Sequence, residues 1–79
     1  MTERYEHPVL GVEHGAHTWC LHCERVWPTR RRAESAWHCP DEDCDGSPLD
    51  AWRWERVREA NPEYPETPAS GELRGLYGS

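Results

Sequence analysis

The sequence reads CLHC at residues 20–23 and CPDEDC at residues 39–44, with fifteen residues between the two cysteine pairs. Two close cysteine pairs joined by a short span are typical of a tetrahedral zinc site, because each pair can hold one edge of the metal from a tight turn. Thiolates are soft anionic ligands that suit zinc at about 2.3 Å. We therefore predict one structural zinc ion with four ligands: Cys20, Cys23, Cys39 and Cys44.

Two other uses of the four cysteines are weighed against zinc. Two disulfides are typical of exported proteins, but residues 1–8 carry no apolar signal stretch. Iron in a rubredoxin-like site would support electron transfer. Rubredoxins, however, have a longer span between the pairs and a two-residue gap within each. Zinc is favoured over both alternatives.

Residues 17–46 resemble a zinc ribbon, in which two cysteine knuckles clamp one zinc between short antiparallel strands. The resemblance implies a small metal-stabilised α+β fold. Two features depart from the ribbon pattern. Glu24 follows the first pair where glycine is frequent, and four residues rather than two separate Cys39 from Cys44. The alternative architecture is a treble clef, in which the last cysteines open a helix.

The chain divides into three predicted segments: a flexible arm at residues 1–16, a zinc-binding domain with its following helix at 17–60, and an extended proline-rich tail at 61–79. Prolines at every third position of the tail favour an extended backbone and forbid helix. Two hypotheses remain for Tyr64: it is part of a solvated tail, or its ring packs on the protein's own tryptophans. A last edge strand is predicted near residues 73–77.

Within the domain, residues 18–27 have the pattern strand, knuckle, strand. Residues 28–32 are predicted as a loop at the far end of a hairpin, and residues 35–38 as the return strand that delivers Cys39. Ser47, Pro48 and Asp50 form a helix-start pattern, which predicts one short helix ending before residue 62. An extended stretch at 48–52 followed by a shorter helix is the alternative.

Five tryptophans carry much of the burying capacity of this short chain, and we predict that they form the packing shell around the metal. His22 and His38 lie inside or beside the cysteine pairs, where they are candidates to hydrogen-bond and orient the thiolates. The other histidines are expected on the surface, since four cysteines saturate the zinc. They are His7, His14 and His17, the last being the alternative metal ligand.

All nine basic residues are arginine, and the formal net charge is −6. A basic patch is predicted from Arg30, Arg31 and Arg32, with Arg25 nearby, to contact a partner or phosphates. The acidic total opposes a polyanion, so protein–protein interaction is favoured and nucleic-acid binding is the alternative. Four cysteine ligands would close the zinc to substrate, so no enzyme activity is expected. With no apolar run of membrane-spanning length, a cytoplasmic protein is expected.

Overall fold

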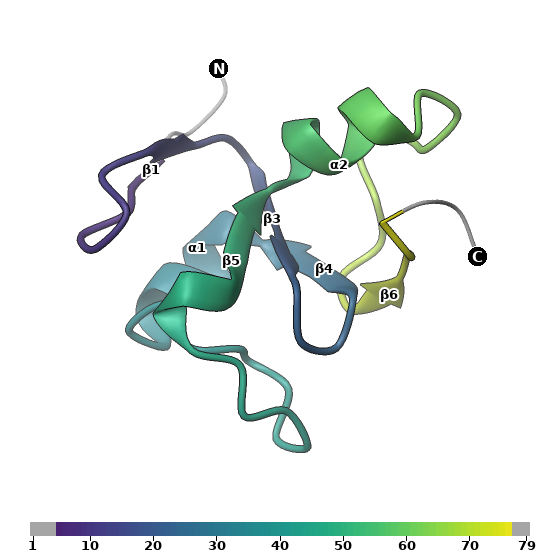
Figure 1. Cartoon of the computed structure of the whole chain (residues 1–79). Coiled ribbons are helices and arrows are strands. Elements are labelled where there is room, and N and C mark those ends of the chain that lie inside the picture. The colour runs from purple at the N-terminus through teal and green to yellow at the C-terminus, as the bar shows by residue number, and fades with distance from the viewer. Residues whose placement is uncertain (1–4, 77–79) are drawn as a thin grey trace.

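The fold is centred on a four-stranded antiparallel sheet, seen in a computed structural model that describes residues 5–76 (Figure 1). The strand order is β5-β3-β4-β6. These strands are β3 (His17–Cys20), β4 (Arg25–Pro28), β5 (Ala51–Arg53) and β6 (Glu72–Leu73). A separate two-stranded sheet pairs β1 (Tyr5–Glu6) with β2 (Glu13–His14). The predicted α+β class is therefore confirmed.

The first cysteine pair closes the hairpin between β3 and β4, as the pattern strand, knuckle, strand predicted. The backbone N–H of Glu24 donates to Cys20 O at 2.7 Å, which makes the tight turn. The turn holds Glu24 at φ 60°, a left-handed conformation in which glycine is less strained than other residues. This conformation explains why zinc ribbons often have glycine at this position, where this chain has glutamate.

The segment between the cysteine pairs corrects two predictions. The expected loop at residues 28–32 is mostly the helix α1 (Thr29–Glu34), because arginine, alanine and glutamate are good helix formers. The expected return strand at residues 35–38 is a turn. Ala36 and Trp37 adopt φ 53° and 66°, so the chain reverses direction there instead of extending.

The second half of the chain supplies the missing strand from further along the sequence. Ser47 and Asp50 form the predicted capping box, but it starts only the 3-10 turn η1 (Pro48–Asp50). β5 follows and pairs with β3, and the helix α2 (Trp54–Ala60) begins after it. The extended alternative at residues 48–52 was therefore nearer the observed structure. The second cysteine pair lies in a loop, and the next element is η1, so the last cysteines do not open a helix as they do in a treble clef.

The sheet separates two interiors, because neighbouring residues of β3 point to opposite faces. Trp19 is opposite Val26 and Trp52 in register and joins a core with Trp54, Val57 and Tyr64. Cys20 lies on the other face. The predicted tryptophan shell around the metal is therefore wrong for Trp19, and Trp37 packs on histidine rings instead.

The proline-rich segment folds back over the core. The Tyr64 ring stacks on Trp54 with centroids 5.8 Å apart and an interplanar angle of 4°, and its hydroxyl donates to Gly75 O at 2.8 Å. The hypothesis that Tyr64 packs on the protein's own tryptophans is thus confirmed. β6 adds to β4 near the predicted edge strand, whose last residue, Tyr77, lies outside the described residues, as do 1–4 of the predicted arm. Within residues 5–76, helix length and hydropathy fall short of what a membrane crossing needs.

Candidate metal centre

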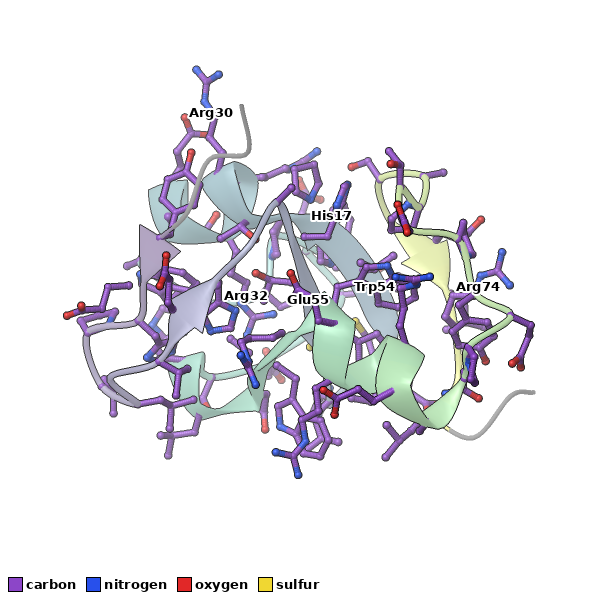
Figure 2. The ribbon with its side chains drawn as sticks, turned by 90° about the horizontal axis from the view of Figure 1, so that it is seen from above. His17, Arg30, Arg32, Trp54, Glu55 and Arg74 are labelled. Atoms are coloured by element: carbon purple, nitrogen blue, oxygen red, sulfur yellow. The ribbon has the colours of Figure 1, made fainter. Side chains whose placement is uncertain are left out.

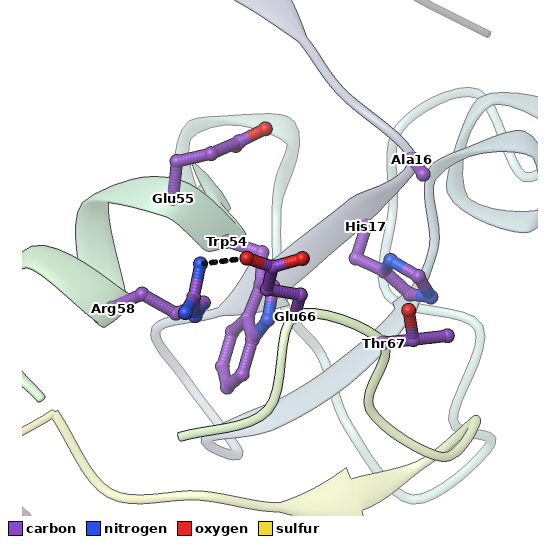
Figure 3. Close-up of a pocket in the computed structure, with 7 residues that line it drawn as sticks. All are labelled: Ala16, His17, Trp54, Glu55, Arg58, Glu66 and Thr67. Atoms are coloured by element: carbon purple, nitrogen blue, oxygen red, sulfur yellow. Dashed lines mark ion pairs between the residues drawn. The ribbon is translucent and has the colours of Figure 1, made fainter. Parts of the chain in front are cut away.

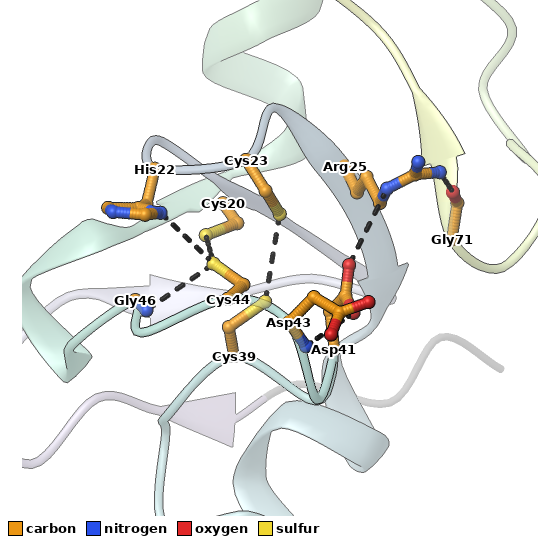
Figure 4. A network of polar contacts seen from close by, with 10 residues as sticks. All are labelled: Cys20, His22, Cys23, Arg25, Cys39, Asp41, Asp43, Cys44, Gly46 and Gly71. Carbon is orange, nitrogen blue, oxygen red and sulfur yellow. Dashed lines mark hydrogen bonds and ion pairs between the residues drawn. The ribbon is translucent and has the colours of Figure 1, made fainter.

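The four cysteine sulfurs meet in one cluster, with all ligand atoms within 4.8 Å of one another (Figure 4). Cys20 and Cys44 place their Sγ atoms 3.8 Å apart, and Cys23 and Cys39 place theirs 3.7 Å apart. A tetrahedron with metal–sulfur bonds of about 2.3 Å has edges of about 3.8 Å. The four thiols are free, and these separations far exceed the roughly 2.05 Å of a disulfide bond. The cluster could therefore hold a metal ion.

The backbone around the cysteines supplies hydrogen bonds to sulfur, and these orient the ligands. The backbone N–H groups of His22 and Cys23 lie near Cys20 Sγ and lower its pKa. The Gly46 N–H points to Cys44 Sγ at 3.3 Å, and the His22 ring approaches the same sulfur through Nδ1, also at 3.3 Å (Figure 4). His22 thus lies where the sequence placed it, beside a thiol.

The electrostatics of the cluster differ from one thiol to the next. Burial raises the pKa of Cys44 to about 11, and it raises the pKa of Cys23 further. Burial also opposes ionisation of Cys20, but the N–H groups of Cys23 and His22 and the nearby Arg32 guanidinium together lower its pKa. A coordinating metal would hold the sulfurs as thiolates, so metal binding must release protons and weaken as the pH falls.

Comparisons of this chain with protein-family models, curated proteins and solved structures find no match.

Close packing around Gly46 brings the second cysteine pair against the first. A Cβ atom at this position would lie 2.9 Å from Cys20 Sγ and 3.1 Å from Cys39 Cβ, closer than side-chain atoms normally approach. The Gly46 carbonyl also accepts from the Cys39 N–H at 3.1 Å. Glycine is needed here because any side chain would displace sulfur.

Replacing Glu24 with glycine is expected to stabilise the metal-loaded protein by about 0.5–1 kcal/mol. The left-handed φ of 60° costs a residue with a Cβ atom about 1–2 kcal/mol, and glycine removes this cost. Glycine also increases the conformational entropy of the unfolded chain, which offsets part of the stabilisation. Urea unfolding measures the change. Glu42→Gly, in the second knuckle without a left-handed φ, is the matched control and should lose stability. A loss in Glu24→Gly as well would contradict the strain argument.

The other predicted site residues lie in different environments, some exposed and some bonded to other segments. His38 is exposed, and among residues 5–76 it has no hydrogen bond to a cysteine sulfur. Arg25 donates to Gly71 O at 2.8 Å and lies 3.6 Å from a carboxylate oxygen of Asp41, so it connects β4 to the second knuckle and the C-terminal segment. Arg30 and Arg31 are exposed on α1, and Arg31 lies 5.1 Å above the Trp27 ring.

Arg32 corrects the prediction of a three-arginine surface patch, because its side chain is fully buried. Figure 2 shows Arg30 pointing away from the molecule and Arg32 pointing into it. Arg32 Nε donates to Trp37 O at 2.7 Å, and Nη2 donates to Ser47 O at 2.8 Å. The guanidinium thereby joins α1 to the segments before and after the second cysteine pair. A surface phosphate could not reach it.

Two buried histidines form a cluster that the sequence interpretation missed. His7 and His14, both expected on the surface, are 0% exposed, and their rings pack on Trp37 at 4.8 and 5.1 Å between centroids. His7 Nδ1 accepts from the backbone N–H groups of Val9 and Leu10, so its Nε2 carries the proton and donates to Pro48 O at 2.7 Å. The cluster attaches the N-terminal hairpin to the segment beside the cysteines.

His14 is expected to make the fold sensitive to mild acid. Its pKa is lowered to about 4 by burial first and then by the nearby charges of His7, Arg53 and Arg32. Between that value and the ordinary 6.5, the unfolded chain binds a proton that the folded chain does not. Stability is therefore complete above about pH 7 and falls as the pH drops, by about 1.4 kcal/mol at pH 5.5.

The measurement is the pH dependence of urea unfolding for the metal-loaded protein and for His14→Gln. Proton uptake by released cysteines is common to both proteins and cancels in the comparison. The variant should show a shallower slope between about pH 5.5 and 7, whatever its absolute stability. Identical slopes would mean that His14 titrates normally in the folded protein.

His17 lies apart from the cysteine cluster, so it is not brought together with the predicted ligands. It lines an open pocket of about 330 Å³ between β3 and α2, together with Glu55 and Thr67 (Figure 3). Burial lowers the pKa of His17, and Glu55 opposes that shift. Arg58 and Glu66 form an ion pair of 3.9 Å at the same pocket. The alternative role of His17 as a metal ligand is therefore wrong.

Proposed function

We propose that this chain is a non-enzymatic module in which a structural zinc ion, held by Cys20, Cys23, Cys39 and Cys44, organises a surface that binds another protein. The observation that carries the proposal is the sulfur arrangement, with separations of 3.7 and 3.8 Å that match the edges of a zinc tetrahedron. Four thiolates complete the coordination of zinc and leave no position for a catalytic water. A structural role for the metal follows.

Iron is the competing metal, since four thiolates also suit a rubredoxin-like centre. Elemental analysis of protein purified from its native cells separates the two. We expect one zinc per chain and a colourless protein. A red protein that is reduced and reoxidised reversibly would make electron transfer the function instead.

The class of partner follows from charge. Four thiolates and one divalent zinc ion bring the formal charge from −6 to about −8, which opposes a polyanion. One observation supports nucleic-acid binding: Arg30 and Arg31 are exposed on α1. With Arg32 buried, that patch is smaller than the sequence suggested. A protein partner is therefore the better-supported proposal.

Binding assays with single-stranded RNA and DNA at several salt concentrations test the partner class. Phosphate contacts would give a log–log slope of about −0.7 to −0.9 per phosphate, reduced in the double variant Arg30→Ala/Arg31→Ala. We expect only negligible retention in about 150 mM salt for both proteins, and a specific protein partner in affinity capture from native cells. Micromolar nucleic-acid binding that the variant loses would overturn the proposal.

A further inference from the structure

One groove on this acidic protein combines exposed apolar side chains with arginines. Leu10, Val12 and Leu49 line it and remain 42%, 39% and 58% exposed. Its volume is about 330 Å³. The first two belong to the N-terminal hairpin loop and the third to η1, so the groove depends on the hairpin being held in place by His7. Exposed apolar side chains gathered around one groove are typical of interaction sites.

The groove runs along the edge of the sheet. All three residues of β5, Ala51, Trp52 and Arg53, line it. Successive strand residues point to opposite faces, so a groove that contacts all three must lie beside the strand. β5 is an outer strand of the described sheet, with β3 as its neighbour in the order β5-β3-β4-β6. The Ala51 N–H already donates to Pro48 O, so an added strand would pair with the remaining backbone groups of this edge.

The charge of the groove is opposite to that of the whole chain. Arg53 and Arg56 are exposed and line the groove, on a protein of net charge −6. The Arg56 guanidinium lies 4.7 Å above the Trp52 ring, which holds it beside the strand. Two guanidinium groups beside the strand favour carboxylates in an occupant, while the leucine and valine side chains favour apolar groups.

The same contacts disfavour a nucleic acid in this groove. Base stacking needs a free aromatic face. Arg56 covers the Trp52 ring, and Trp19 packs against that ring at 5.6 Å between centroids. The remaining surface is aliphatic and offers no platform for a base. The chemistry of the groove therefore suits a peptide.

We propose that the groove along β5 binds an extended segment of a partner protein that carries both apolar and acidic side chains. The backbone of the segment pairs with the edge of β5, its apolar side chains pack on Leu10, Val12 and Leu49, and its carboxylates pair with Arg53 and Arg56. This inference rests on the proposed function, since it requires a protein partner, and it adds the surface and the chemistry of that partner.

The test uses the full chain loaded with zinc and two fluorescent peptides, one of alternating glutamate and valine and one with lysine in place of glutamate. We expect the acidic peptide alone to bind, with amide signals of residues 51–53 and 10–12 shifted in nuclear magnetic resonance spectra. Arg53→Ala/Arg56→Ala should weaken binding about tenfold or more. Arg30→Ala/Arg31→Ala removes the same charge elsewhere and should leave binding unchanged.

A second variant guards against a fold defect. Leu49→Asp alters an exposed side chain of the groove, and it should weaken the acidic peptide while the dispersed amide spectrum is kept. Equal weakening by both arginine pairs, shifts away from β5, no binding, or self-association through the groove would each overturn the inference. Capture of a native partner that Arg53→Ala/Arg56→Ala leaves intact would refute the groove while sustaining the proposed function. Failure of capture and of peptide binding would refute both.

Discussion

Removal of the metal with a chelator is expected to unfold most of the chain. The strands of the central sheet are two to four residues long, too short to be stable without the structure that joins them. The cysteine cluster connects the β3–β4 turn to the segment that leads into β5. Apparent structural zinc binding contributes roughly 10–16 kcal/mol, more than the usual net stability of a small domain.

Amide spectra and circular dichroism before and after chelation, with zinc added back, measure this effect. Cys20→Ser should resemble the chelated protein because its sulfur is the buried member of the cluster. Asp45→Ser, an exposed residue next to Cys44, is the matched control and should remain folded. A chelated protein that keeps a dispersed spectrum would show that the tryptophan core suffices without metal. Detection of two disulfides by mass spectrometry would refute the metal site itself.

Replacing Arg32 with methionine is expected to cost about 1–3 kcal/mol of stability, the usual cost of leaving a buried polar group without its hydrogen bond. Methionine fills a similar volume but removes the donors to Trp37 O and Ser47 O. Ser47 O keeps the Asp50 N–H at 3.0 Å, whereas the buried hydrogen bond to Trp37 O is lost. The substitution also removes a positive charge near Cys20, where that charge favours the thiolate that a metal requires. Both effects lower the stability of the metal-loaded protein.

The experiment compares urea unfolding and chelator resistance of Arg32→Met with those of Arg30→Met. Arg30 is two residues away on the same helix, but it is exposed, and within residues 5–76 its ion pair is with Glu34 at 3.6 Å. Its loss should cost no more than about 0.5 kcal/mol. Similar results for the two variants would mean that the buried guanidinium contributes no more than a surface charge.

The errors of sequence interpretation have physical causes. The arginine run at residues 30–32 reads as a basic surface, because charged residues are seldom fully buried. Arg32 can be buried because its guanidinium donates to two backbone carbonyls and lies near the Cys20 thiol. These partners come from other segments of the chain. The turn at residues 35–38 was missed because alanine and tryptophan rarely adopt a left-handed backbone. Packing of Trp37 on two histidines accompanies that conformation.

Local spacing was enough for the features that depend on neighbours in the chain. The two cysteine pairs, the knuckle between β3 and β4, and the capping box of Ser47 and Asp50 involve residues only a few positions apart. Each of these turns has few sterically allowed conformations, so residue type and spacing nearly define it. The sequence by itself therefore determined the four cysteines of a cluster that could hold a metal ion, and one half of the sheet.

Only the tertiary structure decided which strand completes the sheet and which polar residues enter the interior. β3 pairs with β5 across a long connection, and His7 donates to Pro48 O, 41 positions further along the chain. Such pairings are chosen by the total burial and hydrogen bonding of the folded chain, which no short stretch encodes. The buried Arg32 and the edge of β5 both follow from that choice, because each depends on contacts between segments distant in sequence.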